Sequence, residues 1–423
     1  MNITNFKWLR RLIITSIYGL GVLGIVGSGG GSSGTECLSV NCVDFSELLA
    51  DFPPIPPIPP IPAGGAAEGF NDTVTSIAPA LDSSDDVYVG GSFTIYKNSA
   101  ANGIARINND GSLDTGFVTG TGFDAPVYTV SPANDDSGDV YVGGSFTSYD
   151  GTAIGYIARL KLDGTLDTVF DTGTGFDSTV NIIVPAIDGN GDVYVGGSFT
   201  TYNGIAVGSG LIRLNDNGSL DAGFGTGSGW GESSIALAID DSGDVYVARS
   251  SSPGIARLNN DGSIDTGFDT GLSGFNDEVR AIAVAIGSSG DVYVAGYFDD
   301  YNGTGNSGIV RLHSDGSLDT GFVTPSVHVS QGNFITPAID FSGDIYVDSK
   351  LVNGIVRLND DGSRDRGFDT GSGQFGGFGV RPNSVALATD GSGDIFVGGS
   401  FTRYNFIPAA RIARLTAEGA FVR

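Results

Sequence analysis

An arginine and an aspartate recur together along this sequence, each time on either side of a tight turn. The clearest pairs are Arg106 with Asp114, Arg159 with Asp167, and Arg213 with Asp221. Because Asp-Gly or Asn-Gly lies between the two residues, we expect the side chains to meet across a hairpin as charge-assisted pairs. A ring of basic groups that binds a ligand is the alternative. Recurrence in nearly every copy favours the structural interpretation.

Acidic turns form the second recurring group. The pattern D-x-S/N-G-D is shared by residues 135–139, 188–192, 240–244, 340–344 and 390–394. Calcium prefers six to eight oxygen ligands on a flexible loop, and each of these turns supplies two or three carboxylates. Ordinary turn chemistry also explains them, since Asp and Asn cap turns and accept left-handed backbone angles. We therefore expect no cofactor, with calcium as the alternative at these turns.

Aromatic residues form the third group, and they point to ligand binding. They recur in loops that a repeated fold would gather on one face, as Tyr96, Tyr149, Tyr202, Tyr301 and Tyr404. Aromatic rings among short polar side chains suit sugars. Trp230 replaces a repeated Phe and is the leading candidate for a ligand contact. The regular recurrence of the other rings favours the alternative, in which they pack between neighbouring repeats.

Catalytic motifs are scarce. The two histidines, His313 and His328, lie in one repeat, and neither sits beside a Ser or Cys nucleophile in a known motif. HExxH and Walker patterns are missing, and no Gly-rich stretch has the strand-to-helix context of a nucleophile elbow or a dinucleotide-binding fingerprint. A polysaccharide-acting enzyme, a hydrolase or lyase using loop-face carboxylates, remains the alternative to a binding protein.

The N-terminal residues have the composition of an export signal. Lys7, Arg10 and Arg11 precede an apolar run over 12–26, and small residues follow. We expect residues 1–28 to be a signal peptide, with a retained signal anchor as the alternative. Residues 29–69 are a Gly/Ser-rich and Pro-rich linker, and its prolines favour a semi-rigid rod. Cys37 and Cys42 lie in this linker and are expected to form a disulfide rather than a zinc site.

A repeat explains how all these residues are positioned. A strand with Val-Tyr or Ile-Tyr, or the variant Ile-Phe, recurs once in each of seven similar units spaced about fifty residues apart. In the unit that begins at Val180, we expect strands over 180–187, 193–199, 211–215 and 220–224. Four antiparallel strands repeated radially form the blade of a β-propeller. The sequence therefore predicts an all-β, seven-bladed β-propeller over residues 70–423.

The repeated motif resembles a known family. G-G-S-F-T-x-Y-N-G followed by R-L-N-x-D-G-S-L-D-T-x-F is similar to the delta-60 repeat of bacterial β-propeller proteins, and more distantly to NHL-type propellers. That resemblance implies an exported or surface protein and carries no general biochemical activity. It therefore supports the fold and the location without naming a ligand.

The last unit differs from the other six. A Phe falls eleven residues after the arginine in each of them, and Arg414 has no such residue by Arg423. We expect the outer strand of the last blade to be cut short. Residues 43–52 are a candidate to cover that edge.

The net charge of the protein limits the classes of molecule that it can bind. The formal net charge is −27, which repels nucleic acid and anionic membranes and attracts cations. We expect a monomeric, non-enzymatic binding or scaffold module, secreted, periplasmic or at the cell surface. The propeller itself would not contact the membrane, although an uncleaved signal would anchor the chain. An extracellular glycan or protein is the expected partner, and a structural spacer is a third interpretation.

Overall fold

The structure is a computed structural model, and it describes most of the chain from residue 69 onward. The described residues are 69–187, 191–208, 210–225, 234–240, 242–248, 254–271, 273–287, 290–324, 334–349, 354–370, 375–376, 381–405 and 407–422. The predicted signal, nearly all of the predicted linker with Cys37, Cys42 and the candidate edge cover, Trp230 and His328 lie outside them.

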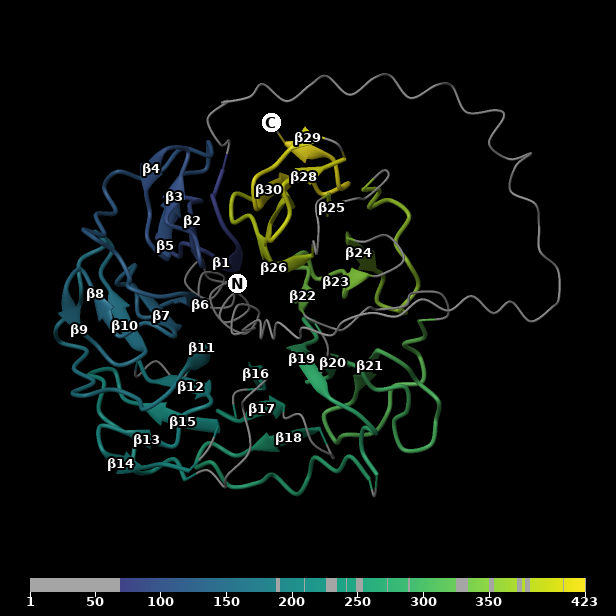
Figure 1. The fold of residues 1–423 in the computed structure, drawn as a ribbon. Helices are drawn as coiled ribbons and strands as arrows, with labels where there is room; N and C mark the ends of the chain where they lie inside the picture. The colour runs from purple at the N-terminus through teal and green to yellow at the C-terminus, as the bar shows by residue number, and fades with distance from the viewer. Residues whose placement is uncertain are drawn as a thin grey trace, which may run out of the picture. The chain divides into compact units, whose positions relative to one another are not determined.

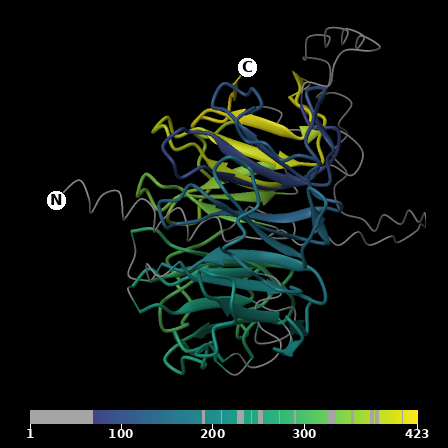
Figure 2. The same ribbon diagram turned by 90° about the vertical axis from the view of Figure 1, so that its left-hand side faces the viewer.

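Seven small antiparallel sheets, which we number blade 1 to blade 7 in chain order, follow one another around a ring (Figure 1). Their first strands line the inside of the ring, and Figure 2 shows the same blades from the side. The first strands are β1 (Val74–Pro79), β6 (Val127–Pro132), β11 (Val180–Pro185), β16 (Ser234–Leu237), β19 (Val279–Val284), β22 (Ile335–Pro337) and β26 (Pro382–Leu387).

The second strand is the central strand of each described sheet, and its composition explains its position. Val, Ile and Tyr alternate there, and these residues favour a pleated strand buried on both faces. The second strands are β2 (Val87–Gly91), β7 (Val140–Gly144), β12 (Val193–Gly197), β17 (Val245–Ala248), β20 (Val292–Gly296), β23 (Ile345–Ser349) and β27 (Ile395–Gly399). All of their described residues are buried.

The third strand of each blade carries the recurring arginine. It pairs antiparallel with the second strand, so that Arg106 lies directly opposite Tyr88 in blade 1. The third strands are β5 (Ile104–Ile107), β10 (Ile157–Leu160), β15 (Gly210–Leu214), β18 (Ile255–Leu258), β21 (Ile309–Leu312), β24 (Gly354–Leu358) and β30 (Ile412–Leu415).

The predicted fourth strand is correct in place but not in extent. In blades 1 to 6 a single bridge stands there, as between Ile107 and Leu113. The exception is blade 7, where β31 (Phe421–Val422) pairs with β30. The prediction of a shortened outer strand in the last blade was therefore wrong. The chain still includes Phe421, which pairs with Leu415 as Leu113 pairs with Ile107 in blade 1.

Short hairpins close the loop between the second and third strands in several blades. They pair β3 (Ile95–Tyr96) with β4 (Ser99–Ala100), β8 (Ser148–Tyr149) with β9 (Thr152–Ala153), β13 (Thr201–Tyr202) with β14 (Ile205–Ala206), and β28 (Arg403–Tyr404) with β29 (Ile407–Pro408). β25 (Phe375–Gly376) adds to the last of these. The described residues contain strands and turns only, with no helix that would cross a membrane.

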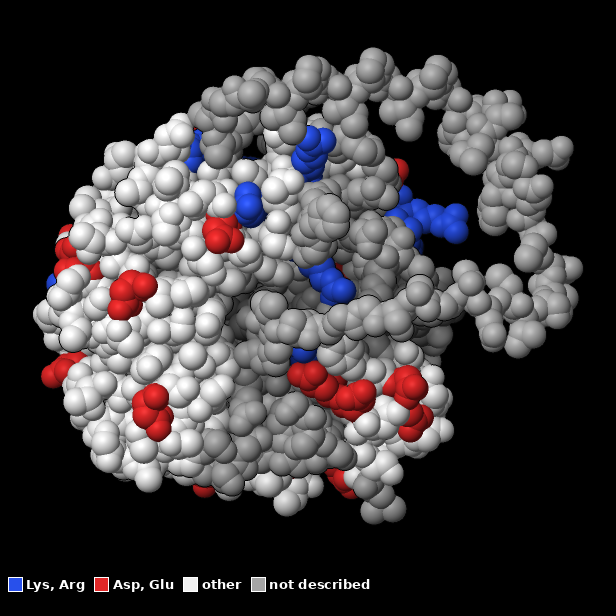
Figure 3. Space-filling view, viewed as in Figure 1, with Lys and Arg blue, Asp and Glu red and all other residues white. Residues whose placement is uncertain are grey.

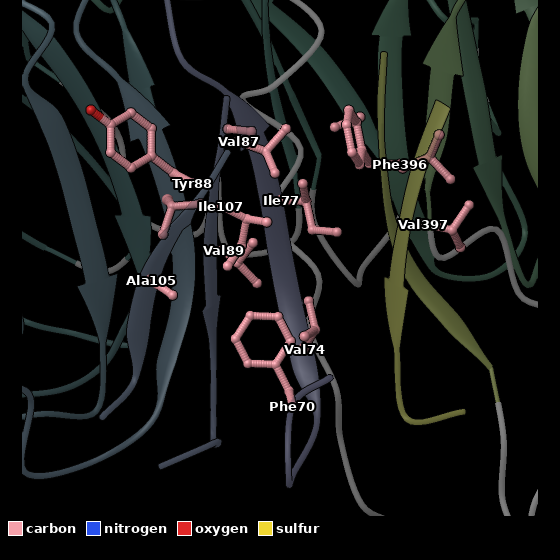
Figure 4. Packing of buried hydrophobic residues seen from close by; sticks show 14 of the residues in the cluster. Phe70, Val74, Ile77, Val87, Tyr88, Val89, Ala105, Ile107, Phe396 and Val397 are labelled. Atoms are coloured by element: carbon pink, nitrogen blue, oxygen red, sulfur yellow. The ribbon is translucent and has the colours of Figure 1, made fainter. Parts of the chain in front are cut away.

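Blades 7 and 1 close the ring side by side, without exchanging a strand. The amide of Ile77 donates to Ser384 Oγ over 3.1 Å, and the amide of Phe70 donates to the Ala410 carbonyl over 3.0 Å. Figure 4 shows Ile77 of β1 beside the blade 7 strand that carries Val397. Each blade is thus built from one continuous segment of chain.

Candidate functional site

The acidic turns hold the arginines of the repeat. In blade 1, Arg106 Nη2 lies 2.5 Å from Asp82 Oδ2, and Arg106 Nε lies 3.1 Å from Asp86 Oδ2. Blades 2, 4 and 7 repeat this contact with their own arginine and the first aspartate of their turn. Burial raises the pKa of Asp82, but bonds from Ser84 and Arg106 outweigh it, so its pKa is below the ordinary value. The guanidinium is therefore a built-in cation of these turns.

The predicted hairpin pairs are present as well. Nitrogen–oxygen distances are 3.4 Å for Arg106–Asp114, 3.6 Å for Arg159–Asp167 and 2.6 Å for Arg213–Asp221. In blades 3, 5 and 6 the arginine binds this later aspartate closely, and in blades 3 and 5 it also contacts a side chain of the next blade, Asn260 or Asp360. Two arrangements of one arginine thus coexist in the ring.

Calcium gains no support from the described carboxylates. Within the described part of the chain, no group of three or more His, Cys, Asp or Glu side chains is placed to hold a metal ion. A turn whose carboxylates already bind a guanidinium has fewer free oxygens for a cation that prefers six to eight. Calcium binding stays a prediction that only an experiment can test.

The five tyrosines proposed as ligand contacts are buried instead. Each is 2% exposed or less, and its hydroxyl donates to a glycine carbonyl of its own blade; the residues are Tyr96, Tyr149, Tyr202, Tyr301 and Tyr404. Phe70 packs against Tyr96 with ring centroids 4.5 Å apart, and the other blades repeat the pair. Since these rings present almost no surface, the structure favours the packing interpretation over the binding one.

The loop-face carboxylates are committed to backbone bonds. Asp177 Oδ1 accepts from the amides of Thr200 and Thr201 at 2.8 and 3.0 Å. Bonds from Thr200 and Thr201 lower the pKa of Asp177 to about 2. Asn71 occupies the same place in blade 1 and accepts the equivalent amide bonds. Because an uncharged amide serves equally well, this position needs an acceptor rather than an acid or a base.

We call the contact between neighbouring blades a seam, and five seams share one hydrogen bond. At seam 1–2, the Tyr88 hydroxyl donates to the Gly138 carbonyl of the next blade over 2.9 Å. The equivalent bonds start at Tyr141, Tyr194, Tyr246 and Tyr293. At seam 6–7 the matching residues, Tyr346 and Gly393, are both described, yet no hydrogen bond joins them; both line a cavity.

Residue size explains why seam 6–7 differs. In blade 1, a Cβ added to Gly90 would lie 2.6 Å from Val127 Cγ1 of the next inner strand, so there is little room, and blades 4 and 5 carry nothing larger than alanine at this place. Blade 6 carries Asp348 at this place, followed by Ser349, and both are 3% exposed. We infer that a side chain of this size holds the outer part of blade 7 away from blade 6, while the inner strands stay in contact, since Thr336 Oγ1 of β22 donates to the Val385 carbonyl of β26 over 3.4 Å.

The result is a cavity of about 380 Å³ between blades 6 and 7. Its wall includes Ile339, Leu387, Tyr346 and Ala417, and its polar groups include Asp340 and Arg357. Phe341 stands at the rim with 52% of its surface exposed. Its φ of 62° is positive, as are those of Ser83 and Asp136 at the same turn position, so a bulky aromatic residue here adopts the left-handed conformation of the repeated turn.

Sequence reasoning missed this site, although the repeats carry its signal. Aligned units show Gly90 replaced by Asp348, Ser83 by Phe341 and Leu162 by Ala417. The other predicted candidates add little. His313 is a half-exposed turn residue whose Nδ1 lies 3.3 Å from Asp291 Oδ1, and Trp230 lies outside the described residues.

The described surface seen in Figure 3 carries acidic side chains at many separate places. This distribution is consistent with the net charge of −27 and does not itself mark a site.

Comparison with solved structures supports the fold. The WD40 β-propeller domain of Doa1 is 18% identical with a TM-score of 0.51, and the match covers 79% of this chain and 92% of that one. A streptogramin B lyase is 15% identical with a TM-score of 0.47, covering 80% and 92%. No curated protein sequence matches this chain. These similarities show the fold alone.

A family model matches seven segments of the chain, which together make up more than half of it. They are residues 84–117, 137–170, 189–224, 242–268, 287–322, 339–368 and 390–421, and they correspond to the seven blades. The chain therefore belongs to the β-propeller family described as domain of unknown function DUF5122.

Proposed function

We propose that this protein is an exported, non-enzymatic binding or scaffold module whose binding site is the cavity at seam 6–7. The observation that carries the proposal is the contrast between this seam and the five that the tyrosine bond closes. A cavity of about 380 Å³ falls within the range of ligand sites, which are mostly apolar with a few converging polar groups. Its wall has this composition.

This proposal places the binding site at the face of the acidic turns, whereas the sequence predicted it at the face of the tyrosine loops. The acidic turns lie at the end of the blades opposite to the loops that carry the five tyrosines, because the first and second strands run antiparallel. Seam 6–7 is therefore reached from the turn face. The export signal expected in residues 1–28 and the resemblance to delta-60 repeats support a place outside the cytoplasm.

An enzyme is the less favoured candidate. Asp124 and Asp177 at the loop face accept hydrogen bonds from neighbouring backbone amides, and Asn71 and Asn276 take the same role in other blades. A catalytic carboxylate pair would need its charge at a fixed position. A structural spacer, the third candidate, does not account for the missing tyrosine bond and the apolar cavity at seam 6–7.

The test is a glycan array together with an array of extracellular proteins, probed with the full chain. We expect hits that Ala417→Leu removes, because Ala417 lines the cavity and a leucine side chain would occupy part of its volume. Asp124→Asn at the opposite face is the matched control and should keep every hit. Hits that survive Ala417→Leu would place binding elsewhere, and turnover of an arrayed glycan would favour the enzyme.

A further inference from the structure

The turn of blade 6 keeps the acidic motif of the other blades while its arginine points elsewhere. In blades 1, 2, 4 and 7, the first aspartate of the turn binds the arginine Nη2 at 2.5 to 2.6 Å. In blade 6 that aspartate is Asp340. The contacts of Arg357 are instead with Asp365, with Asp344 at 3.5 Å and with the Ala417 carbonyl at 3.3 Å.

Asp340 therefore lines the seam 6–7 cavity without an arginine bound to it. The amide of Ser342 donates to Asp340 Oδ1 over 3.0 Å, which fixes the turn as in the other blades. The acceptor that holds a guanidinium in four blades is thus preserved in blade 6. It faces a cavity into which a guanidinium from outside can enter.

The neighbouring carboxylates do not compete for such a group. Asp390 and Asp394, which also line the cavity, bind Arg414 at 2.6 and 2.8 Å. Asp344 lies 3.5 Å from Arg357. Burial raises the pKa of Asp344, and the negative charge of Asp340 raises it further. Asp340 is therefore the carboxylate through which the cavity would gain a favourable charge pair.

The rest of the wall suits the stem of the same ligand. Arginine buries its methylene groups on apolar surface and stacks its planar head on aromatic rings. Ile339, Leu387 and Ala417 supply the apolar surface, and the exposed ring of Phe341 stands next to Asp340 in the chain. In the intact blades, the repeat's own arginine has similar surroundings, with Arg106 Cζ 5.5 Å from the centre of the Tyr88 ring.

We propose that seam 6–7 binds an arginine side chain presented by a partner polypeptide, with its guanidinium on Asp340 and its stem between blades 6 and 7. The inference rests on the proposed binding function and names the ligand class for that site. The net charge of −27 favours the approach of such a partner, and a bidentate carboxylate–guanidinium contact favours arginine over lysine.

The experiment is a calorimetric titration of the full chain with acetyl-Gly-Gly-Arg-Gly-Gly-amide. The same peptide with citrulline in place of arginine keeps the shape and removes the charge. We expect the arginine peptide to bind at least about tenfold more tightly than the citrulline peptide, as a charge-assisted bond predicts. Acetyl-arginine-amide alone should bind more weakly than the pentapeptide, and equal binding would mean that no polypeptide is needed.

Two variants and a control locate the site. Asp340→Asn should weaken the arginine peptide about tenfold or more, and Ala417→Leu should abolish its binding. Asp124→Asn removes one carboxylate at the other face and should leave the affinity unchanged. Asp340 is exposed in a turn, so its variant is expected to fold, and a thermal melt of each protein checks this.

The outcomes separate the two proposals. If array hits disappear in Ala417→Leu while the arginine and citrulline peptides bind equally or not at all, the cavity is a binding site but the arginine assignment is wrong. If neither the array nor the peptides give binding, both proposals fail. Arginine binding that survives Asp340→Asn would contradict the assignment to this carboxylate.

Discussion

Seams 1–2 and 6–7 are built from the same repeat, yet the tyrosine bond joins only the first, where the hollow is an open groove, and the second holds a more enclosed cavity. At seam 1–2, Gly90 admits the next inner strand, and the Tyr88 hydroxyl donates to Gly138 over 2.9 Å. At seam 6–7, Asp348 occupies the glycine position and Tyr346 lines a cavity of about 380 Å³. The two seams thus differ in the size of the side chain at the point of closest approach.

The comparison also separates two uses of the same carboxylate. Asp82 in blade 1 binds Arg106 and stabilises its own blade, whereas Asp340 in blade 6 faces the cavity. If the proposed site binds its ligand, a repeat protein can obtain a binding site by losing one internal contact, without adding a loop. The effects below test this comparison from the largest to the smallest.

Placing an aspartate at the closed seam should have the largest effect. In Gly90→Asp the new Cβ would lie 2.6 Å from Val127 Cγ1 and 2.8 Å from Val130 Cγ1. Overpacking together with a buried, unpaired charge should lower the free energy of unfolding by about 5 kcal/mol or more. Gly90→Ala is the matched control and should cost about 1–3 kcal/mol. Urea denaturation measures both, and an unchanged midpoint for Gly90→Asp would break the comparison.

Neutralising the first aspartate of the turn should lower the free energy of unfolding more in blade 1 than in blade 6. The effect should be smaller than that of Gly90→Asp. Asp82→Asn removes the acceptor for Arg106 and should cost about 1.5–3 kcal/mol of unfolding free energy. Asp340→Asn, the same change in blade 6, should stay within about 0.5 kcal/mol because no arginine depends on it. Thermal melts of the two proteins at pH 7 test this, and equal losses would show that Asp340 is also structural.

Removing the seam hydroxyl should have a still smaller effect. Tyr88→Phe loses the bond to the Gly138 carbonyl and should destabilise the fold by about 1 kcal/mol. Tyr346→Phe lacks such a bond to lose and should be closer to the wild type. Denaturant midpoints of both variants give the difference. A larger cost for Tyr346→Phe would mean that seam 6–7 is held by this hydroxyl after all.

The smallest effect lies away from both seams and depends on pH. The pKa of Asp177 is lowered to about 2, so its stabilising contribution is present above pH 4 and is lost as pH falls from about 4 to about 2. Asp177→Asn should change the stability at pH 7 by no more than about 0.5 kcal/mol, as Asn71 already holds the same loop in blade 1. It should also weaken the acid dependence. Stability curves recorded between pH 2 and 7 measure this.

Much of the architecture could be predicted from the repeat. Strand positions, the seven blades and the Arg–Asp pairs follow from local patterns such as Val-Tyr-Val and Asp-Gly, whose effects act within one hairpin. The length of the fourth strand was overestimated, because a single bridge at residues such as Leu113 is enough to complete a blade. The sequence did not settle whether the five tyrosines pack or bind a ligand, because their burial depends on Phe70 and its equivalents, which come from the preceding connection.

The candidate site was harder to predict for a physical reason. Asp348, Phe341 and Ala417 are unremarkable residues by type, and their effect depends on which residue of the next blade each one meets. The sequence alone does not show why Gly90 is small; the short distance to Val127 in the structure explains it. Aligning the units position by position would have singled out Asp348, since a charged residue there is an exception in the repeat.

The most direct test is a crystal structure of the double variant Asp348→Gly, Ser349→Gly, which restores the glycine pair of blade 1 to blade 6. We predict that the outer part of blade 7 moves toward blade 6 and that the Tyr346 hydroxyl comes within hydrogen-bonding distance of the Gly393 carbonyl, near the 2.9 Å seen at seam 1–2, while the cavity shrinks. A cavity of unchanged volume, with Tyr346 and Gly393 still apart, would contradict the claim that this side chain opens the seam.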